Sequence, residues 1–179
     1  MKHMSGYVRC ITMLILMAVM FSGGSVHAAS EMARSAPDRL IGKIMRVASE
    51  SQQSINSRPF SVGDSLKKAE KSWGKPEDLS TVAANYWSHH VRFLYDGSTS
   101  RKTITAIDDF SPQLQTIHLV EVKNLLGEPD RAKEQEGMYY VTYTDNENYK
   151  IIFVFESAWN NPNPILNMYT VEPADESSK

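Results

Sequence analysis

An internal repeat constrains the fold of this sequence more than any other feature. The segment 62–77 matches the segment 115–130, which lies 53 positions later. In each copy, three apolar residues have the i, i+3, i+7 spacing of one helical face. They are Leu66, Ala69 and Trp73 in the first copy and Leu119, Val122 and Leu126 in the second. We therefore expect two similar units, each of which begins with a short helix.

The same termination signal follows both predicted helices. Gly74 and Gly127 come directly after the helical pattern, and Pro76 and Pro129 follow two residues later. Glycine readily adopts the left-handed conformation that closes a helix, and proline cannot continue one. These four residues are therefore predicted to be structural helix stops.

A stretch rich in aromatic and β-branched residues follows each stop and predicts strands. The predicted strands cover 86–89, 91–95 and 102–107 in the first copy and 139–144, 149–156 and 165–171 in the second. An amphipathic helix is expected from 31 to about 55. The predicted fold is α+β: an N-terminal helix and then two tandem repeats of a helix plus antiparallel strands, which form one sheet with helices on one side.

Residues 1–28 have the three zones of a secretory signal peptide. A cationic stretch with Lys2 and Arg9 precedes an apolar run over 10–21, and small residues lead to Ala28. Cleavage is expected after Ala28 or, as second choice, after Ala29. An uncleaved membrane anchor is less favoured, because the run has about twelve residues and a bilayer span needs about twenty. The mature protein is expected to be secreted, extracellular or associated with the cell wall, without a stable membrane anchor.

Charge and cysteine content narrow the possible partners. The chain of 179 residues has 19 Lys and Arg against 21 Asp and Glu, so it has no basic footprint and no nucleic-acid partner is expected. Cys10 is the only cysteine and lies in the predicted signal peptide, so the mature chain can form no disulfide. The expected organisation is signal peptide 1–28, helix and linker 29–57, repeats 58–114 and 115–172, and a polar tail 173–179.

The sequence contains no pattern typical of a catalytic site. A Gly-x-Ser-x-Gly elbow, a phosphate-binding glycine loop and a His-Glu-x-x-His motif are all missing, so no catalytic residue and no cofactor are expected. His89 and His90 are adjacent, and on a strand their side chains would point to opposite faces. With His118 far along the chain, no metal site is expected.

Aromatic residues are the remaining candidates for binding, because tyrosine and tryptophan are favoured where a sheet meets a partner. Alternation along the predicted strands places Tyr140, Thr142, Arg92 and His90 nearer the exposed face, and Trp159 lies in a loop rich in Asn and Pro. The alternative is that all the aromatic side chains simply pack in the core.

The helix, the Gly-x-Pro stop and the strands that follow resemble the SmpA/OmlA modules of bacterial envelopes, and in tandem they resemble the β-lactamase-inhibitor-like fold. With 73–76, 110–114 and 146–150, the mature chain is similar to the YjgB family of secreted Bacillus proteins. The resemblance implies a fold and suggests binding to other proteins through an exposed sheet face. It does not extend to inhibition of β-lactamase, since those inhibitors carry a disulfide in each repeat.

These observations lead us to expect an exported, non-enzymatic binding protein that engages another protein or a cell-wall component. Two alternatives remain open. One is a secreted cell-wall hydrolase that uses paired carboxylates, with Asp108, Asp109, Glu121 and Glu156 as candidates. The other is a structural component of the envelope or of a spore.

Overall fold

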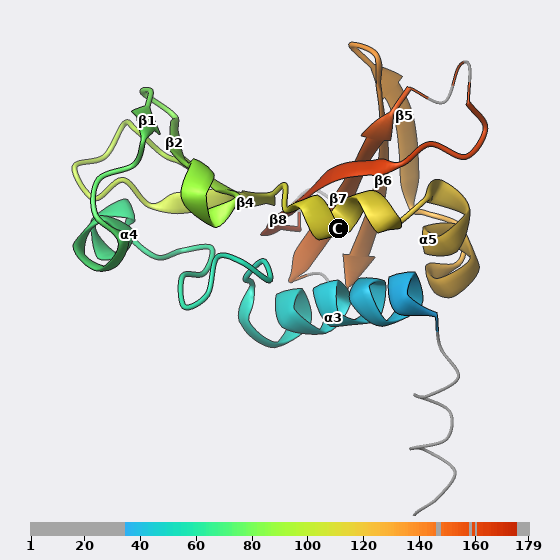
Figure 1. Ribbon diagram of the computed structural model, residues 1–179. Helices are drawn as coiled ribbons and strands as arrows, with labels where there is room; N and C mark the ends of the chain where they lie inside the picture. The colour runs from blue at the N-terminus through green and yellow to red at the C-terminus, as the bar shows by residue number, and fades with distance from the viewer. Residues whose placement is uncertain (1–34, 146–147, 158, 160, 175–179) are drawn as a thin grey trace, which may run out of the picture. The chain divides into compact units, whose positions relative to one another are not determined.

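The computed structural model describes residues 35–145, 148–157, 159 and 161–174. The predicted signal peptide and residues 175–179 of the predicted polar tail lie outside these residues. The fold class is α+β, as predicted. The described residues form one antiparallel sheet of eight strands and three α-helices (Figure 1).

The strands form two meanders, and each meander follows a short helix. The elements are α3 (Ala36–Ser51), α4 (Leu66–Trp73), β1 (Asp78–Leu79), β2 (Ala83–Tyr86), β3 (Val91–Tyr95), β4 (Ile104–Asp109), α5 (Leu119–Leu126), β5 (Arg131–Gln135), β6 (Met138–Asp145), β7 (Tyr149–Glu156) and β8 (Leu166–Pro173). The strand order β1-β2-β3-β4-β8-β7-β6-β5 joins the two meanders through their last strands. This junction pairs Ile107–Asp109 of β4 with Tyr169–Val171 of β8.

The two short helices end in the same setting. Gly74 follows α4 with φ 88° and ψ −171°, and Gly127 follows α5 with φ 85° and ψ −165°. This region of backbone conformation is accessible essentially only to glycine. A tyrosine hydroxyl donates a hydrogen bond to the carbonyl of each glycine: Tyr86 to Gly74 at 3.1 Å and Tyr143 to Gly127 at 2.9 Å. The end of each helix is thereby tied to a strand of its own meander.

All three helices pack on one face of the sheet. A row of direct cross-strand neighbours marks this face: Phe93, Ile107, Val171, Ile151 and Tyr143. The members on β3 and β4 belong to the hydrophobic cluster that α4 covers, and the others belong to the cluster that α3 and α5 cover. Figure 1 shows α4 beside the first meander and α3 and α5 beside the second. The opposite face carries none of the three helices.

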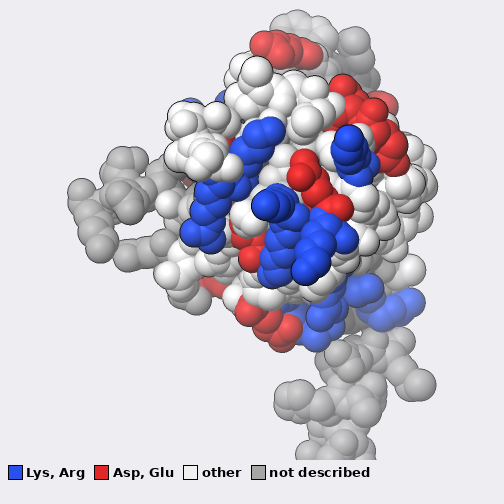
Figure 2. Space-filling model, turned by 90° about the vertical axis from the view of Figure 1, so that its left-hand side faces the viewer, with Lys and Arg blue, Asp and Glu red and all other residues white. Residues whose placement is uncertain are grey.

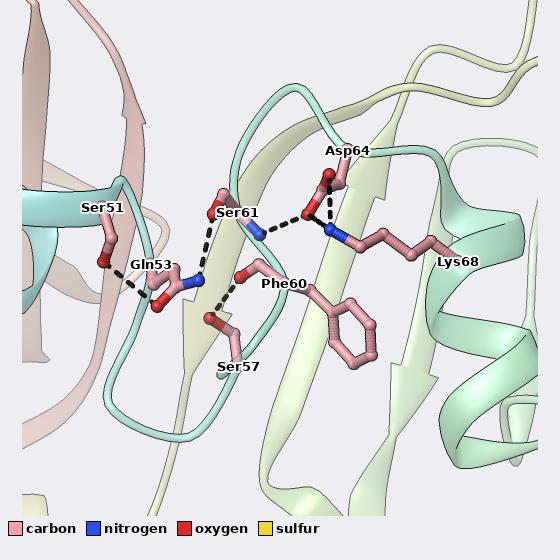
Figure 3. A network of polar contacts seen from close by, with 7 residues as sticks. All are labelled: Ser51, Gln53, Ser57, Phe60, Ser61, Asp64 and Lys68. Carbon is pink, nitrogen blue, oxygen red and sulfur yellow. Dashed lines mark hydrogen bonds and ion pairs between the residues drawn. The ribbon is translucent and has the colours of Figure 1, made fainter.

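The segment between α3 and α4 is held by a chain of polar contacts (Figure 3). The Ser51 hydroxyl donates to the Gln53 side chain, and Gln53 donates to the Ser61 hydroxyl, each at 3.0 Å. The Ser61 amide donates to Asp64 at 3.0 Å, and Lys68 of α4 pairs with the same carboxylate at 3.0 Å. These contacts fix the path of the chain from one hydrophobic cluster to the other.

The predicted strand over 86–89 is wrong. Tyr86 ends β2, and Trp87–His89 form a 3-10 helix (η1) in which the His90 amide donates to the Trp87 carbonyl at 3.1 Å. The imidazole of His89 stacks on Trp73 with ring centroids 3.9 Å apart, which holds this turn against α4. His89 and His90 are therefore not alternating residues of a strand.

Other elements also differ from the prediction, among them α3, β1, β5 and β4. α3 ends at Ser51, because Gln52 has a φ of 53° and its amide donates to the Ala48 carbonyl. β1 and β5 are edge strands whose residues are all exposed, so they lack the apolar alternation that reveals a strand. β4 begins and ends two residues later than the strand predicted over 102–107.

Candidate functional site

One residue from each strand contributes to a continuous row across the face opposite the helices, which we call the open face. The members of this transverse row, each the direct neighbour of the next, are Asp78, Asn85, Arg92, Asp108, Thr170, Ile152, Thr142 and Arg131. Its ends carry opposite charges, and Ile152 is its one apolar member. No described helix lies on it.

Side-chain hydrogen bonds join the first two members of the transverse row and, separately, the next three. Asn85 donates to Asp78 at 2.9 Å. The Arg92 Nε and Nη2 atoms both lie 2.6 Å from Asp108 Oδ2, and the Thr170 hydroxyl donates to Asp108 Oδ1 at 2.7 Å. Because Asp108 is only 2% exposed, its charge needs the compensation that Arg92 supplies. The buried Asn85 Oδ1 has no hydrogen-bond partner among the residues that the structure describes.

A second, more apolar row runs beside the transverse row over the second meander. It consists of Met168, Val154, Tyr140 and Lys133, again as direct cross-strand neighbours. The Lys133 Nζ lies 5.2 Å from the centroid of the Tyr140 ring, within range of a cation–π interaction. Val154 is 3% exposed although no described helix covers it.

The residues predicted to bind a partner fall into three places. Arg92 and Thr142 are members of the transverse row, and Tyr140 lies in the adjacent apolar row. His90 is exposed at the left-handed turn that precedes β3, with φ 55°. Trp159 lies in the connection between β7 and β8 and is 88% exposed. The structure thus brings Arg92, Tyr140 and Thr142 onto one face and leaves Trp159 outside the sheet.

Sequence reasoning did not identify Asn85 and Thr170, and it assigned Asp108 to another role. These residues belong to the site because of the strand register. It places Asp108 directly opposite Arg92 on one neighbouring strand and directly opposite Thr170 on the other. The available signal was the polar character of Asn85 and Asp108 within otherwise apolar strands. A polar residue in such a strand is informative only when its cross-strand neighbours are known.

The four candidate carboxylates lie in different settings. Asp108 and Asp109 are consecutive in β4, so their side chains point to opposite faces and cannot share a cleft. Glu121 accepts a hydrogen bond from the His118 amide at 2.6 Å, at the start of α5. Glu156 is exposed at the end of β7.

Within the described parts of the chain, no three His, Cys, Asp or Glu side chains are grouped so that they could hold a metal ion. None of the described helices is long and apolar enough to cross a membrane.

A solved structure shares this fold. It is the crystal structure of a DUF4309 family protein (YjgB) from Bacillus subtilis subsp. subtilis str. 168, with a TM-score of 0.60 and 14% sequence identity. The match covers 76% of this chain and 97% of that chain. No curated protein matches the sequence significantly. The family model described as "Domain of unknown function (DUF4309)" matches residues 42–171, which is well over half of the sequence. The chain therefore belongs to the DUF4309 family.

Proposed function

We propose that this protein is an exported, non-enzymatic binding protein that engages another protein or a cell-wall component through the open face. The transverse row is the observation that supports this function best. It places polar groups from seven of the eight strands on a face that carries no described helix. Export rests on residues 1–28, whose sequence is typical of a signal peptide.

The size of the open face suits a protein interface. Strands about 4.8 Å apart make a sheet of eight strands about 34 Å wide, and strands of this length run for about 20 Å. The face therefore offers about 700 Å², close to the roughly 800 Å² that each partner contributes to a standard interface. Met168, Tyr140 and Lys133 of the apolar row keep accessible area that a partner can bury. The accessible polar members of the transverse row, such as Asp78, Thr142 and Arg131, supply directional hydrogen bonds.

We also propose that the two meanders are tandem repeats in an arrangement like that of β-lactamase inhibitors, with SmpA/OmlA-like units. Three similarities support the duplication: the mirrored strand order, the glycine-closed helices, and a bridge that ties the residue before each helix to the segment before a later strand. The bridges are Ser65 with Thr103 and His118 with Ile165. In such a duplication the open face belongs to both repeats.

Capture from a culture supernatant and from purified cell walls tests the proposed function. The immobilised mature protein should retain a defined component, and the double variant Tyr140→Ala/Thr142→Ala should lose most of it. The matched control Val120→Ala/Asn124→Ala alters exposed positions of α5, on the other face, and should capture normally. Circular dichroism checks that both variants are folded.

Two results would reject the open face as the binding surface. One is equal capture by the wild type and by the Tyr140→Ala/Thr142→Ala variant. The other is loss of capture in the α5 control alone, since that result would place the contact among the helices.

A further inference from the structure

The exposed side of α4 carries lysines that the fold leaves largely unpaired. Lys67, Lys68, Lys71 and Lys75 are all exposed, and among them only Lys68 has an ion-pair partner in the described structure, Asp64. Figure 2 views the side on which α4 lies and shows Lys and Arg side chains gathered near its centre, with Asp and Glu between and around them. Lys67 and Lys71 are one helical turn apart, and like charges at this spacing destabilise a helix.

Folding does not require lysines at these positions, as α5 demonstrates. Counted back from the glycine that closes each helix, Lys71 and Lys67 of α4 correspond to Asn124 and Val120 of α5. Lys68 corresponds to Glu121 in the same way, and Lys75, which follows the glycine, corresponds to Glu128. Both helices have eight residues and the same glycine conformation. The lysines of α4 are therefore an addition to the shared framework.

No ion pair joins Lys67 or Lys71 to a carboxylate in the described structure. Asp64 is occupied by Lys68 and by the Ser61 amide. Glu70 and Glu77 are close enough to Tyr86 to raise the pKa of its hydroxyl, after the larger effect of burial. Lys75 borders a groove that Glu70, Glu77 and Asp78 also line, so its charge is the most offset of the three unpaired lysines.

We propose that the three unpaired lysines, Lys67 and Lys71 of α4 and Lys75 just after it, bind a flexible linear polymer of phosphates. Lysine binds phosphate as a compact point charge without fixed geometry, which suits a chain that can shift along the helix. A folded protein partner fits less well, because lysine is depleted in protein interfaces. Single-stranded nucleic acid fits less well too, since it requires stacking platforms and Trp73 is already stacked on His89.

This inference goes beyond the proposed function and does not depend on it. The lysines lie on α4, whereas the proposed interface lies on the opposite face of the sheet. A protein with both surfaces could hold a wall polymer on one side and a second component on the other.

Fluorescence anisotropy with labelled inorganic polyphosphate tests this inference. Counterion release gives a slope of log K against log salt concentration of about −0.7 per neutralised charge on a flexible strand, so three lysines predict a slope of about −2. Replacing two lysines with the α5 residues (Lys67→Val/Lys71→Asn) should bring the slope to about −0.7 and weaken binding about tenfold at low salt. The reciprocal graft, Val120→Lys/Asn124→Lys, should strengthen binding.

The matched control is Lys43→Asn/Arg46→Asn, which removes the same net charge from two exposed positions of α3. It should bind polyphosphate almost as the wild type does. Equal weakening in this control and in the α4 variant would overturn the inference, because only net charge would then matter. Absence of binding by the wild type at low salt would also overturn it. Equal affinity for poly-glutamate or for a DNA oligomer would reject a preference for phosphate polymers. None of these results bears on capture through the open face.

Discussion

At the junction of the two meanders, the side chains of two consecutive aspartates point to opposite faces of the sheet. Asp108 points to the open face and is held by Arg92 and Thr170. Asp109 points to the helical face, is fully buried, and accepts hydrogen bonds from the Tyr169 hydroxyl and from the Asn56 amide. The first residue contributes to the proposed binding surface, and the second ties the linker between α3 and α4 to the sheet.

Replacing Asp109 with alanine should strongly destabilise the protein. The substitution leaves buried donors of Asn56, Ser111 and Tyr169 without this acceptor. Each unpaired buried donor costs about 1–3 kcal/mol, so we expect a loss of about 3 kcal/mol or more in the free energy of unfolding. Urea denaturation measures it. Glu50→Ala, which removes an exposed carboxylate near the end of α3, is the control and should have a small effect; similar losses in the two variants would contradict the assigned role of Asp109.

The hydroxyls that tie the helix ends to the strands predict sensitivity to alkaline pH. Burial, reinforced by Glu70, raises the pKa of Tyr86 to about 12, and burial reinforced by Glu128 raises the pKa of Tyr143 to about 12. An unfolded tyrosine ionises near pH 10. The folded state therefore keeps protons that the unfolded state loses, and this stabilisation is complete below pH 10 and is lost as the pH rises through about 12.

Thermal melts between pH 9 and about pH 12 test this dependence. The Tm of the wild type should fall over this range, and the fall should be shallower in Tyr86→Phe/Tyr143→Phe. Tyr140→Phe removes a hydroxyl from the open face and serves as the control. A pH profile that does not change in the double variant would show that the two buried hydroxyls do not govern the alkaline loss.

At the scale of elements, each of the two short helices is closed by a glycine that no other residue replaces without strain. A Cβ added at Gly74 or Gly127 would meet no atom within 4 Å, so the cost of a side chain there lies in the backbone conformation alone. With similar φ and ψ at both positions, the two costs should also be similar.

Gly74→Ala and Gly127→Ala should each lower the free energy of unfolding by about 1–3 kcal/mol. Gly42→Ala is a matched control inside α3, where a Cβ also meets nothing within 4 Å. It should stabilise the protein by about 0.5–1 kcal/mol, because alanine favours the helix. Chemical denaturation of the three variants gives the comparison. If Gly74→Ala and Gly127→Ala lower the free energy of unfolding by widely different amounts, the two helix ends are not equivalent.

How far the elements can be predicted depends on their polarity. Apolar spacing and a Gly-x-Pro stop reveal α4 and α5, and aromatic alternation reveals β6 and β7. β5 is missed because charged residues occupy most of an exposed edge. It is harder still to predict which side chains share a face of the sheet. The register between β3 and β4 shifts at Leu94/Tyr95, and such a shift reverses which side chains share a face. The pairing of Arg92 with Asp108 was therefore beyond sequence reasoning.

At the scale of the whole molecule, one sheet carries two hydrophobic clusters on one face and a polar row on the other. The three residue pairs between β4 and β8 make the transverse row continuous across both meanders. An interface on the open face would therefore depend on both halves of the sheet, as the proposed duplication implies.

Hydroxyl-radical footprinting of the protein together with the component that it captures tests the proposed binding surface most directly. Tyr140 and Met168, which are partly exposed on the open face, should become protected when the component is bound, and Met45 of α3 should not. Protection of Met45 with unchanged oxidation of Tyr140 and Met168 would show that binding occurs on the helical face and would contradict the account.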